Sequence, residues 1–183
     1  MAELILGGAR SGKSALAERR AIESGLAVHY IATGSAGDAE MAARIRHHRA
    51  RRPAHWQLAE VPLHLAVALR ERAAPDRCLL VDCLTLWLSN LLHHGRGGTQ
   101  AEAGEPLDCP LFNAETTALL TALSTLPGRV ILVSNEVGLG IVPLGALTRC
   151  YVDAAGRLNQ QVAAACGRVT FVAAGLSLEL KSP

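Results

Sequence analysis

Aromatic residues are scarce in this chain, whose 183 residues include two Trp, two Tyr and two Phe. The core must therefore be built from Leu, Val, Ile and Ala, which fill buried parallel strands and the helices that cover them. Stacking platforms for bases are missing, and the formal net charge of +2 is too small to attract nucleic acid. These two shortages argue against RNA or DNA as the partner.

Paired cysteines and long apolar runs are lacking as well. The five cysteines are an odd number with no C-x-x-C pair, so they predict neither a disulfide framework nor a zinc site. Free thiols are typical of a reducing compartment, which predicts a cytoplasmic protein. The N-terminal apolar stretch is one strand long without a basic flank, so we expect no signal peptide. No run reaches the roughly 18 apolar residues of a spanning helix, and we expect no membrane insertion.

A phosphate-binding pattern stands near the N-terminus. Residues 7–14 read GGARSGKS, which fits G-x-x-x-x-G-K-S between an apolar strand, 4–6, and a predicted helix, 13–23. Glycines let backbone N–H groups turn toward a phosphate, Lys13 adds positive charge for the β- and γ-phosphates, and Ser14 can place its hydroxyl on Mg²⁺. The alternative is a chance match in a glycine-rich turn, but strand, loop and helix stand in the order that the pattern requires.

Strand and helix patterns alternate along the rest of the chain. Strands are predicted over 28–32, 78–82, 130–133, 169–173 and 177–180, and helices over 38–52, 62–73, 84–92, 111–126 and 144–166. A break in the last helix is expected near Gly156, and the Gly- and Pro-rich segment 94–110 is expected to be a mobile surface loop. The alternation predicts one domain over residues 1–183, an α/β, P-loop NTPase-like (RecA-like) three-layer sandwich with a mainly parallel sheet.

An acidic residue closes the apolar run 78–81. Four apolar residues followed by Asp82 form the second signature of phosphate-loop NTPases, in which a buried strand delivers a carboxylate that holds Mg²⁺ beside the loop. The alternative is an Asp that caps the helix predicted from Leu84. Because residues 7–14 already form a phosphate loop, we favour the metal role.

The predicted helix 38–52 is unusually rich in arginine and histidine. At about 100° per residue, Arg44, His47 and Arg51 fall on one stripe, while His48 falls on the next. Guanidinium groups bind phosphate bidentately, and an imidazole can attack phosphorus to form a covalent P–N intermediate. The stripe therefore suits a nucleoside triphosphate, and the alternative is a solvated basic face.

Two further polar patches lie where a ligand could reach them. Residues 135–138 follow an apolar strand, whose carboxyl end is expected to line the ligand crevice. Residues 153–160 interrupt an otherwise apolar helix, where Arg157 can reach a phosphate and Asn159 or Gln160 can bond a base or an amide edge. Ordinary loop and helix-cap chemistry explains both patches equally well.

Taken together, these segments resemble one family, the bifunctional adenosylcobinamide kinase / adenosylcobinamide-phosphate guanylyltransferases of adenosylcobalamin biosynthesis. The likeness runs nearly end to end. The matching pieces are 7–14 (GGARSGKS), 30–33 (YIAT), 40–45 (EMAARI), His47-His48, 52–56 (RPAHW), Glu60, 135–138 (NEVG), 140–143 (GIVP), 155–157 (AGR) and Asn159-Gln160. The phosphate loop is shared with many enzyme types, whereas the other pieces in combination are specific.

The resemblance implies a two-step enzyme. The family transfers the γ-phosphoryl group of ATP or GTP to the hydroxyl of the aminopropanol arm of adenosylcobinamide. A histidine is then guanylylated by GTP with release of pyrophosphate, and the GMP passes to adenosylcobinamide phosphate, giving adenosyl-GDP-cobinamide. The cofactors implied are GTP, ATP and Mg²⁺, and the resemblance suggests a homo-oligomer, namely a trimer.

In the family the nucleophile is the first histidine of the pair, which falls on His47 here. The implied nucleotide contacts are Gly7, Gly8, Ala9, Arg10, Ser11, Gly12, Lys13, Ser14, Thr33, Gly34, Ser35, His48, Arg49, Ala50, Arg51, Glu60 and Asp82. Ser14 and Asp82 are also the expected metal ligands. The chain departs from the family at 34–37, which is smaller and more flexible than usual, and at 94–110, which is poorly shared.

Two alternatives to this bifunctional enzyme remain. A simple small-molecule kinase of the same fold, with the histidine helix as a lid over the phosphates, would phosphorylate cobinamide without any guanylylated product. A non-catalytic nucleotide-binding switch would bind GTP tightly and turn over no corrinoid.

Overall fold

A computed structural model describes residues 1–34, 53–95, 97–103 and 108–182. The strands are β1 (Ala2–Gly7), β2 (Ala27–Ala32), β3 (Gln57–Glu60), β4 (Arg77–Asp82), β5 (Arg129–Asn135), β6 (Arg168–Ala173) and β7 (Leu176–Lys181). The helices are α1 (Lys13–Glu23), α3 (Leu65–Arg72), α4 (Leu84–His94), α5 (Gly97–Glu102), α6 (Pro110–Leu123) and α7 (Ala146–Ala165). Among these helices, none is long and apolar enough to cross a bilayer.

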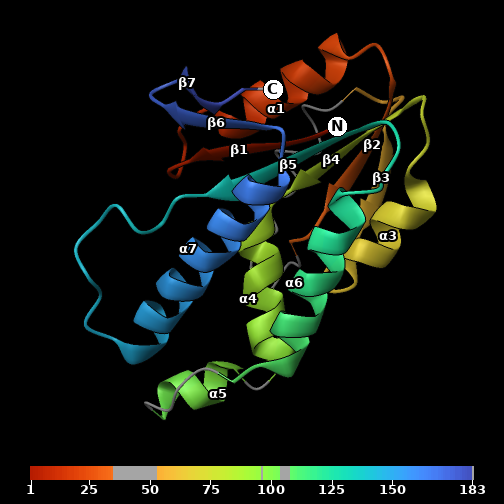
Figure 1. Ribbon diagram of the computed structural model, residues 1–183. Coiled ribbons are helices and arrows are strands. Elements are labelled where there is room, and N and C mark those ends of the chain that lie inside the picture. Colours follow the sequence, from red (N-terminus) through yellow and green to blue (C-terminus); the bar gives the residue numbers. More distant parts are fainter. Residues whose placement is uncertain (35–52, 96, 104–107, 183) are drawn as a thin grey trace.

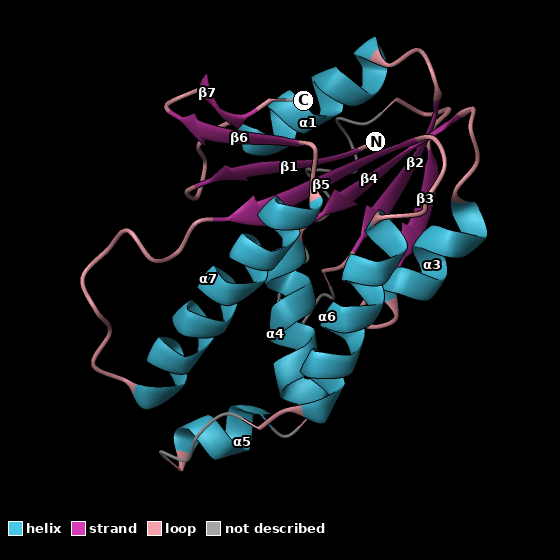
Figure 2. Ribbon diagram, in the orientation of Figure 1, coloured by secondary structure: helices cyan, strands magenta, loops and turns pink. Residues whose placement is uncertain are grey.

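The described strands form one sheet in the order β3-β2-β4-β5-β1-β6-β7. Neighbouring strands are parallel except for β7, which runs antiparallel to β6. Helix α1 covers one face, and α3, α4, α6 and α7 lie on the other (Figures 1 and 2). The arrangement confirms the predicted α/β three-layer sandwich with a mainly parallel sheet.

Two apolar clusters hold the layers together, one on each face of the sheet. Ile5 of β1 packs with Leu16 of α1 on the first face, whereas its neighbour Leu4 points to the other face, among Trp87 and Leu88 of α4. Successive side chains of a strand point to opposite faces, so a strand covered on both sides is apolar throughout. Burying each of these side chains contributes about 1.5–3 kcal/mol.

The sequence-based boundaries differ from the structure at three places. Helix α7 runs unbroken through Gly156, because the buried apolar face of this helix outweighs the cost of about 1 kcal/mol for one glycine. The expected loop 94–110 contains the short helix α5, and β3 was not predicted because its four residues are largely exposed and lack an apolar run. The predicted helix 38–52 lies outside the described residues.

Candidate nucleotide-binding site

The carboxyl ends of the parallel strands bring the candidate residues to one edge of the sheet. Gly7 at the end of β1 pairs with Asn135 at the end of β5. Asp82 at the end of β4 pairs with Val133 on one side and with Ala32 on the other, and Ala32 pairs in turn with Glu60. Strand β5 therefore lies between the strand that carries the phosphate loop and the strand that carries the acidic signature. Ligand sites of open parallel sheets form at this edge.

The phosphate loop is a tight turn between β1 and α1. Gly12 has a φ of 98°, a left-handed conformation that favours glycine. A Cβ on Gly7 would stand 2.5 Å from the backbone oxygen of Val172, so only glycine fits there without displacing β6. The Ser11 carbonyl accepts a 2.8 Å bond from the Gly175 N–H, which ties the loop to the β6–β7 turn. The loop thus keeps the form in which its N–H groups can surround an anion.

Exposure within residues 7–14 varies with position. Gly7, Ser11 and Lys13 are buried, Gly8 and Ser14 are half-buried, and Ala9, Arg10 and Gly12 are exposed. The buried Ser11 hydroxyl has no hydrogen-bonding partner in the described structure. A buried hydroxyl of this kind is costly unless a ligand or water pairs with it, which fits an anion-binding turn.

Lys13 is a cation held largely away from solvent. It is 8% exposed, and its Nζ donates one hydrogen bond, of 3.1 Å, to the Gly8 carbonyl. Burial lowers the pKa of Lys13 below 10.5, although the neighbouring Cys83 and Asp82 act in the opposite direction. The folded protein therefore disfavours the charged lysine, and a bound polyanion would relieve that cost.

Asp82 is oriented by a hydrogen bond from the neighbouring strand. The Tyr30 hydroxyl donates to Asp82 Oδ2 at 2.8 Å, and the Tyr30 ring stacks on Trp56 with centroids 6.4 Å apart. Tyr30 is buried whereas Asp82 is half-buried, so a rigid aromatic group holds a carboxylate that faces the edge. The sequence pattern did not predict this contact, although Tyr30 stands two residues before the end of β2, on the strand beside Asp82.

Thr33 was expected to touch the nucleotide, and the structure buries it completely, with 0% exposure. Its hydroxyl donates to the Cys83 carbonyl at 2.7 Å and accepts from the Cys83 N–H at 2.9 Å. Gly34 is half-buried and Glu60 is exposed at the end of β3. Ser35, His47, His48, Arg49, Ala50 and Arg51 lie outside the described residues.

A network of polar side chains fixes the edge between β4, β5 and α7. The Asn135 amide donates to Thr85 Oγ1 at 2.8 Å, and Thr85 Oγ1 lies 3.1 Å from Cys83 Sγ. Asn159 of α7 accepts a 2.7 Å bond from the Ser134 hydroxyl and donates to the Asn135 carbonyl at 3.2 Å. Asn159 therefore holds α7 against the end of β5. Burial raises the pKa of Cys83 to about 11, which keeps this thiol neutral.

The donors at this edge are oxygen atoms of the kind that Mg²⁺ prefers. Ser14 contributes a hydroxyl at the start of α1, and Asp82 has one carboxylate oxygen beyond the one that Tyr30 engages. Among the described residues, no three His, Cys, Asp or Glu side chains gather as a metal cluster. One carboxylate and one hydroxyl fit an ion that is completed by phosphates and water.

Comparisons with known proteins agree with this geometry. The chain matches the family model described as "Cobinamide kinase / cobinamide phosphate guanyltransferase" over residues 3–180. It is 61% identical over 181 residues to the "Bifunctional adenosylcobalamin biosynthesis protein CobP" of Pseudomonas aeruginosa, a match that covers 99% of this chain and 98% of that protein. It is 42% identical over 179 residues to the corresponding CobU of Salmonella typhimurium, a match that covers 97% of this chain and 98% of that protein.

Among solved structures, the fold is similar to that of the assembled ATPase EscN from the enteropathogenic E. coli type III secretion system. The TM-score is 0.58 at 13% identity, and the match covers 94% of this chain and 43% of that one. A likeness at this identity concerns the fold alone, and it confirms the P-loop NTPase-like architecture.

Proposed function

Because this chain belongs to the cobinamide kinase / cobinamide phosphate guanyltransferase family, we propose that it catalyses both reactions of that name. In the first, ATP or GTP phosphorylates adenosylcobinamide. In the second, GMP passes from GTP through a guanylylated histidine to adenosylcobinamide phosphate, giving adenosyl-GDP-cobinamide. The observation that carries the proposal is a buried cation, Lys13, in a phosphate loop, together with the oriented carboxylate of Asp82. The strands that carry the loop and Asp82 are separated by β5 alone.

In the kinase reaction the chain binds and positions the triphosphate. Backbone N–H groups of residues 7–14 hold the phosphates, and Lys13 pairs with their charge, which offsets the cost of its burial. Ser14 and Asp82 would hold Mg²⁺, which neutralises charge on the transferring phosphoryl group when bound. The acceptor hydroxyl forms a bond to the γ-phosphorus as the bond to the β–γ bridging oxygen breaks, and the nucleoside diphosphate leaves. The hydroxyl proton goes to a base or to solvent.

In the guanylyltransferase reaction we assign the nucleophile to His47. A neutral ring nitrogen attacks the α-phosphorus of GTP, the bond to pyrophosphate breaks, and the imidazole loses its proton. A phosphate oxygen of the phosphorylated corrinoid then attacks the same phosphorus, the P–N bond breaks, and the departing imidazole takes up a proton again from solvent. Neighbouring arginines, including Arg49 and Arg51, would oppose protonation of the ring and orient the α-phosphate.

Of the remaining nucleotide contacts, Gly34 and Glu60 are assigned by their place at the sheet edge, and the others by the family resemblance alone. Gly34 follows the end of β2 and Glu60 is the last residue of β3, both on the side of Asp82 away from the phosphate loop. We assign them, with Ser35, His48 and Ala50, to the guanosine part of the ligand. The hydroxyl of Thr33 is fully engaged by Cys83, so Thr33 contributes by holding the backbone next to Asp82.

A homo-oligomer, a trimer by family resemblance, is part of the same proposal. Ile141 and Leu144, in the loop between β5 and α7, are each 98% exposed. Apolar side chains exposed together commonly mark a contact with another protein. Sedimentation equilibrium of the purified chain tests this, and a monomer at all concentrations would contradict it.

The reaction products test the two-step assignment. The wild-type chain, incubated with GTP, Mg²⁺ and adenosylcobinamide, is expected to form first the phosphorylated and then the GDP-linked corrinoid, separated by chromatography. The His47→Asn chain is expected to form the phosphorylated corrinoid and no GDP-linked corrinoid, because it lacks the nucleophile while its phosphate loop is intact. His93→Asn, at an exposed position on α4, is the matched control and is expected to complete both steps.

Other product patterns would contradict the proposal. A wild-type chain that phosphorylates the corrinoid and never guanylylates it would be a simple kinase. A His47→Asn variant that still makes the GDP-linked product would refute the role of that histidine.

A further inference from the structure

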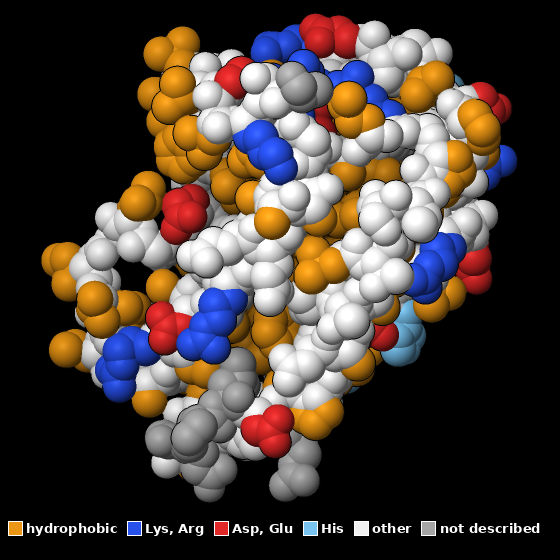
Figure 3. Space-filling model, viewed as in Figure 1, with side chains coloured by type: hydrophobic (Ala, Val, Ile, Leu, Met, Phe, Trp, Pro, Cys, Tyr) orange, Lys and Arg blue, Asp and Glu red, His pale blue; other side chains and the backbone are white. Residues whose placement is uncertain are grey.

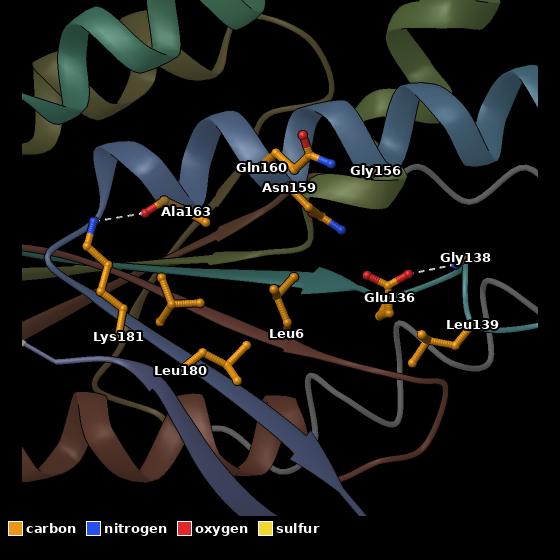
Figure 4. A pocket seen from close by; sticks show the side chains of 11 residues that line it. Leu6, Glu136, Gly138, Leu139, Gly156, Asn159, Gln160, Ala163, Leu180 and Lys181 are labelled. Atoms are coloured by element: carbon orange, nitrogen blue, oxygen red, sulfur yellow. Dashed lines mark hydrogen bonds between the residues drawn. The ribbon is translucent and has the colours of Figure 1, made fainter.

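A hollow of about 490 Å³ lies between α7 and the strands β1, β6 and β7. Figure 4 shows Gln160 on one side of it, on α7, with Leu6 and Leu180 on the side of the strands and Glu136 and Leu139 at one end. We propose that this hollow holds the edge of the corrin ring of cobinamide while the aminopropanol arm reaches the phosphate loop. The inference rests on the proposed function and adds the site where the acceptor substrate binds.

One end of the hollow is joined to the phosphate loop. Leu6 lines the hollow and directly precedes Gly7, the first residue of the loop. Glu136, at one end of the hollow, donates its backbone N–H to the Gly7 carbonyl at 3.1 Å. A ligand that extends past Glu136 therefore emerges at the sheet edge where the phosphates are bound. The acceptor hydroxyl stands on an arm of the corrinoid, so the ring can rest here while that arm crosses the edge.

The lining matches the chemistry of a corrinoid. Leu6, Val169 and Leu180 form an apolar wall, which suits a flat, largely apolar macrocycle. Primary amides fringe such a ring, and Gln160 and Glu136 stand where they can meet them. The Gln160 side chain has no hydrogen bond within the described structure, and the Glu136 carboxylate accepts a single one there, of 2.7 Å, from the Gly138 N–H.

The charge of the hollow argues against a second nucleotide. Among the described residues that line it, Lys181 is the single cation, and its Nζ is already bonded to the Ala163 and Ala164 carbonyls, each at 3.2 Å. Glu136 leaves the hollow negative near the phosphate loop. A polyphosphate would be repelled there, whereas a corrinoid, which carries positive charge on its cobalt centre, would be attracted.

The rim adds apolar surface that faces solvent. Leu139 is 80% exposed and Leu180 is 57% exposed, and Figure 3 shows hydrophobic side chains over β7. Apolar groups that rim a hollow are typical of a site that a ligand covers. A second copy of this chain is the other occupant that such a surface admits, and the experiment separates the two.

The test uses two variants at exposed rim positions and one matched control. Gln160→Trp fills the hollow and Leu180→Lys places a charge on its wall. Gln161→Trp adds the same bulk to the next residue of α7, which is exposed and does not line the hollow. Each chain is assayed for the KM of cobinamide and for guanylylation of the protein by GTP alone, which needs no corrinoid.

Both rim variants are expected to raise the KM about tenfold or more, the effect of losing one or two good contacts. Their guanylylation rate with GTP alone should equal that of the wild type, and Gln161→Trp should match the wild type in both measurements. An unchanged cobinamide KM in both variants overturns the inference. So does a Leu180→Lys chain that changes its sedimentation mass while keeping the wild-type KM, because the wall would then be a subunit interface.

Failure of the proposed function is recognised separately, from the wild-type chain. If that chain turns over no cobinamide, equilibrium dialysis with cobinamide decides the present inference alone. Binding to the wild type that is lost in both rim variants supports it, and no binding to the wild type overturns it.

Discussion

Replacing Lys13 by Met separates the contribution of its charge to GTP binding from its effect on the stability of the ligand-free chain. The methionine side chain is similar in length and carries no charge, so it fits the same buried position. Because burial lowers the pKa of Lys13, the folded chain favours a neutral side chain at this position more than water does. We therefore expect the ligand-free Lys13→Met chain to be more stable than the wild type.

The expected gain in stability of Lys13→Met can be given a size. Replacing a functional residue that the fold disfavours typically adds about 0.5–2 kcal/mol to the free energy of unfolding, and each kcal/mol raises Tm by about 2–4 °C in a chain of this length. The affinity for GTP should decrease. Loss of a hydrogen bond to a charged group costs about 1.5–3 kcal/mol, which weakens GTP binding roughly 10- to 100-fold.

Thermal unfolding with and without GTP measures both effects. The control is Arg19→Met on the exposed face of α1, where a surface change should alter stability by less than about 0.5 kcal/mol. A ligand-free Lys13→Met chain that is less stable than the wild type would refute the account of Lys13 as a cation that the fold disfavours. Undiminished stabilisation by GTP would refute its role in binding.

The pH dependence of the free energy of unfolding tests the burial of Lys13 independently. The pKa of Lys13 is lower in the folded than in the unfolded chain, so between those two values the unfolded chain binds more protons and stability rises with pH. The contribution of Lys13 is constant below the folded pKa and levels off again above 10.5, the ordinary value for lysine. Lys13→Met should lack this rise, and an identical pH profile in both chains would count against the argument.

Three further predictions concern the sheet edge. Tyr30→Phe removes the hydrogen bond to Asp82. A double-mutant cycle with Asp82→Asn, measured by urea unfolding, should give a coupling energy of about 1–2 kcal/mol, and additive effects of the two substitutions would contradict the contact. Gly12→Ala should cost about 1–3 kcal/mol in the same measurement because the position has a φ of 98°, and an unchanged midpoint would show that the turn relaxes. Asn159→Leu leaves the Ser134 hydroxyl buried and unpaired, and calorimetry should show a loss of about 1–3 kcal/mol where a neutral result would contradict the network.

The strand edge could be predicted from the sequence because it depends on apolar runs and on the polar residues at their carboxyl ends. Glycine and lysine at fixed spacing after the first run predicted the loop at residues 7–14, and an acid after a later run placed Asp82 on the same edge. Both predictions rest on the strong preference of buried parallel strands for apolar residues. The structure confirms each strand and its end.

The contacts across the sheet could not be predicted in the same way. The bond from Tyr30 to Asp82 and the one from Asn135 to Thr85 join residues about 50 positions apart, and they depend on strand order, which the apolar pattern does not contain. Thr33 shows the consequence. The family resemblance implied a nucleotide contact for Thr33, whereas the packing of β2 against β4 turns its hydroxyl inward to Cys83.

Mass spectrometry of the intact chain after incubation with GTP and Mg²⁺ shows whether a covalent guanylylated intermediate forms. We expect a gain of one GMP per chain that is lost in acid, that maps to His47, and that requires the Lys13 side chain. A wild-type chain that turns over GTP without ever carrying GMP, or that carries it on another residue, would refute this mechanism.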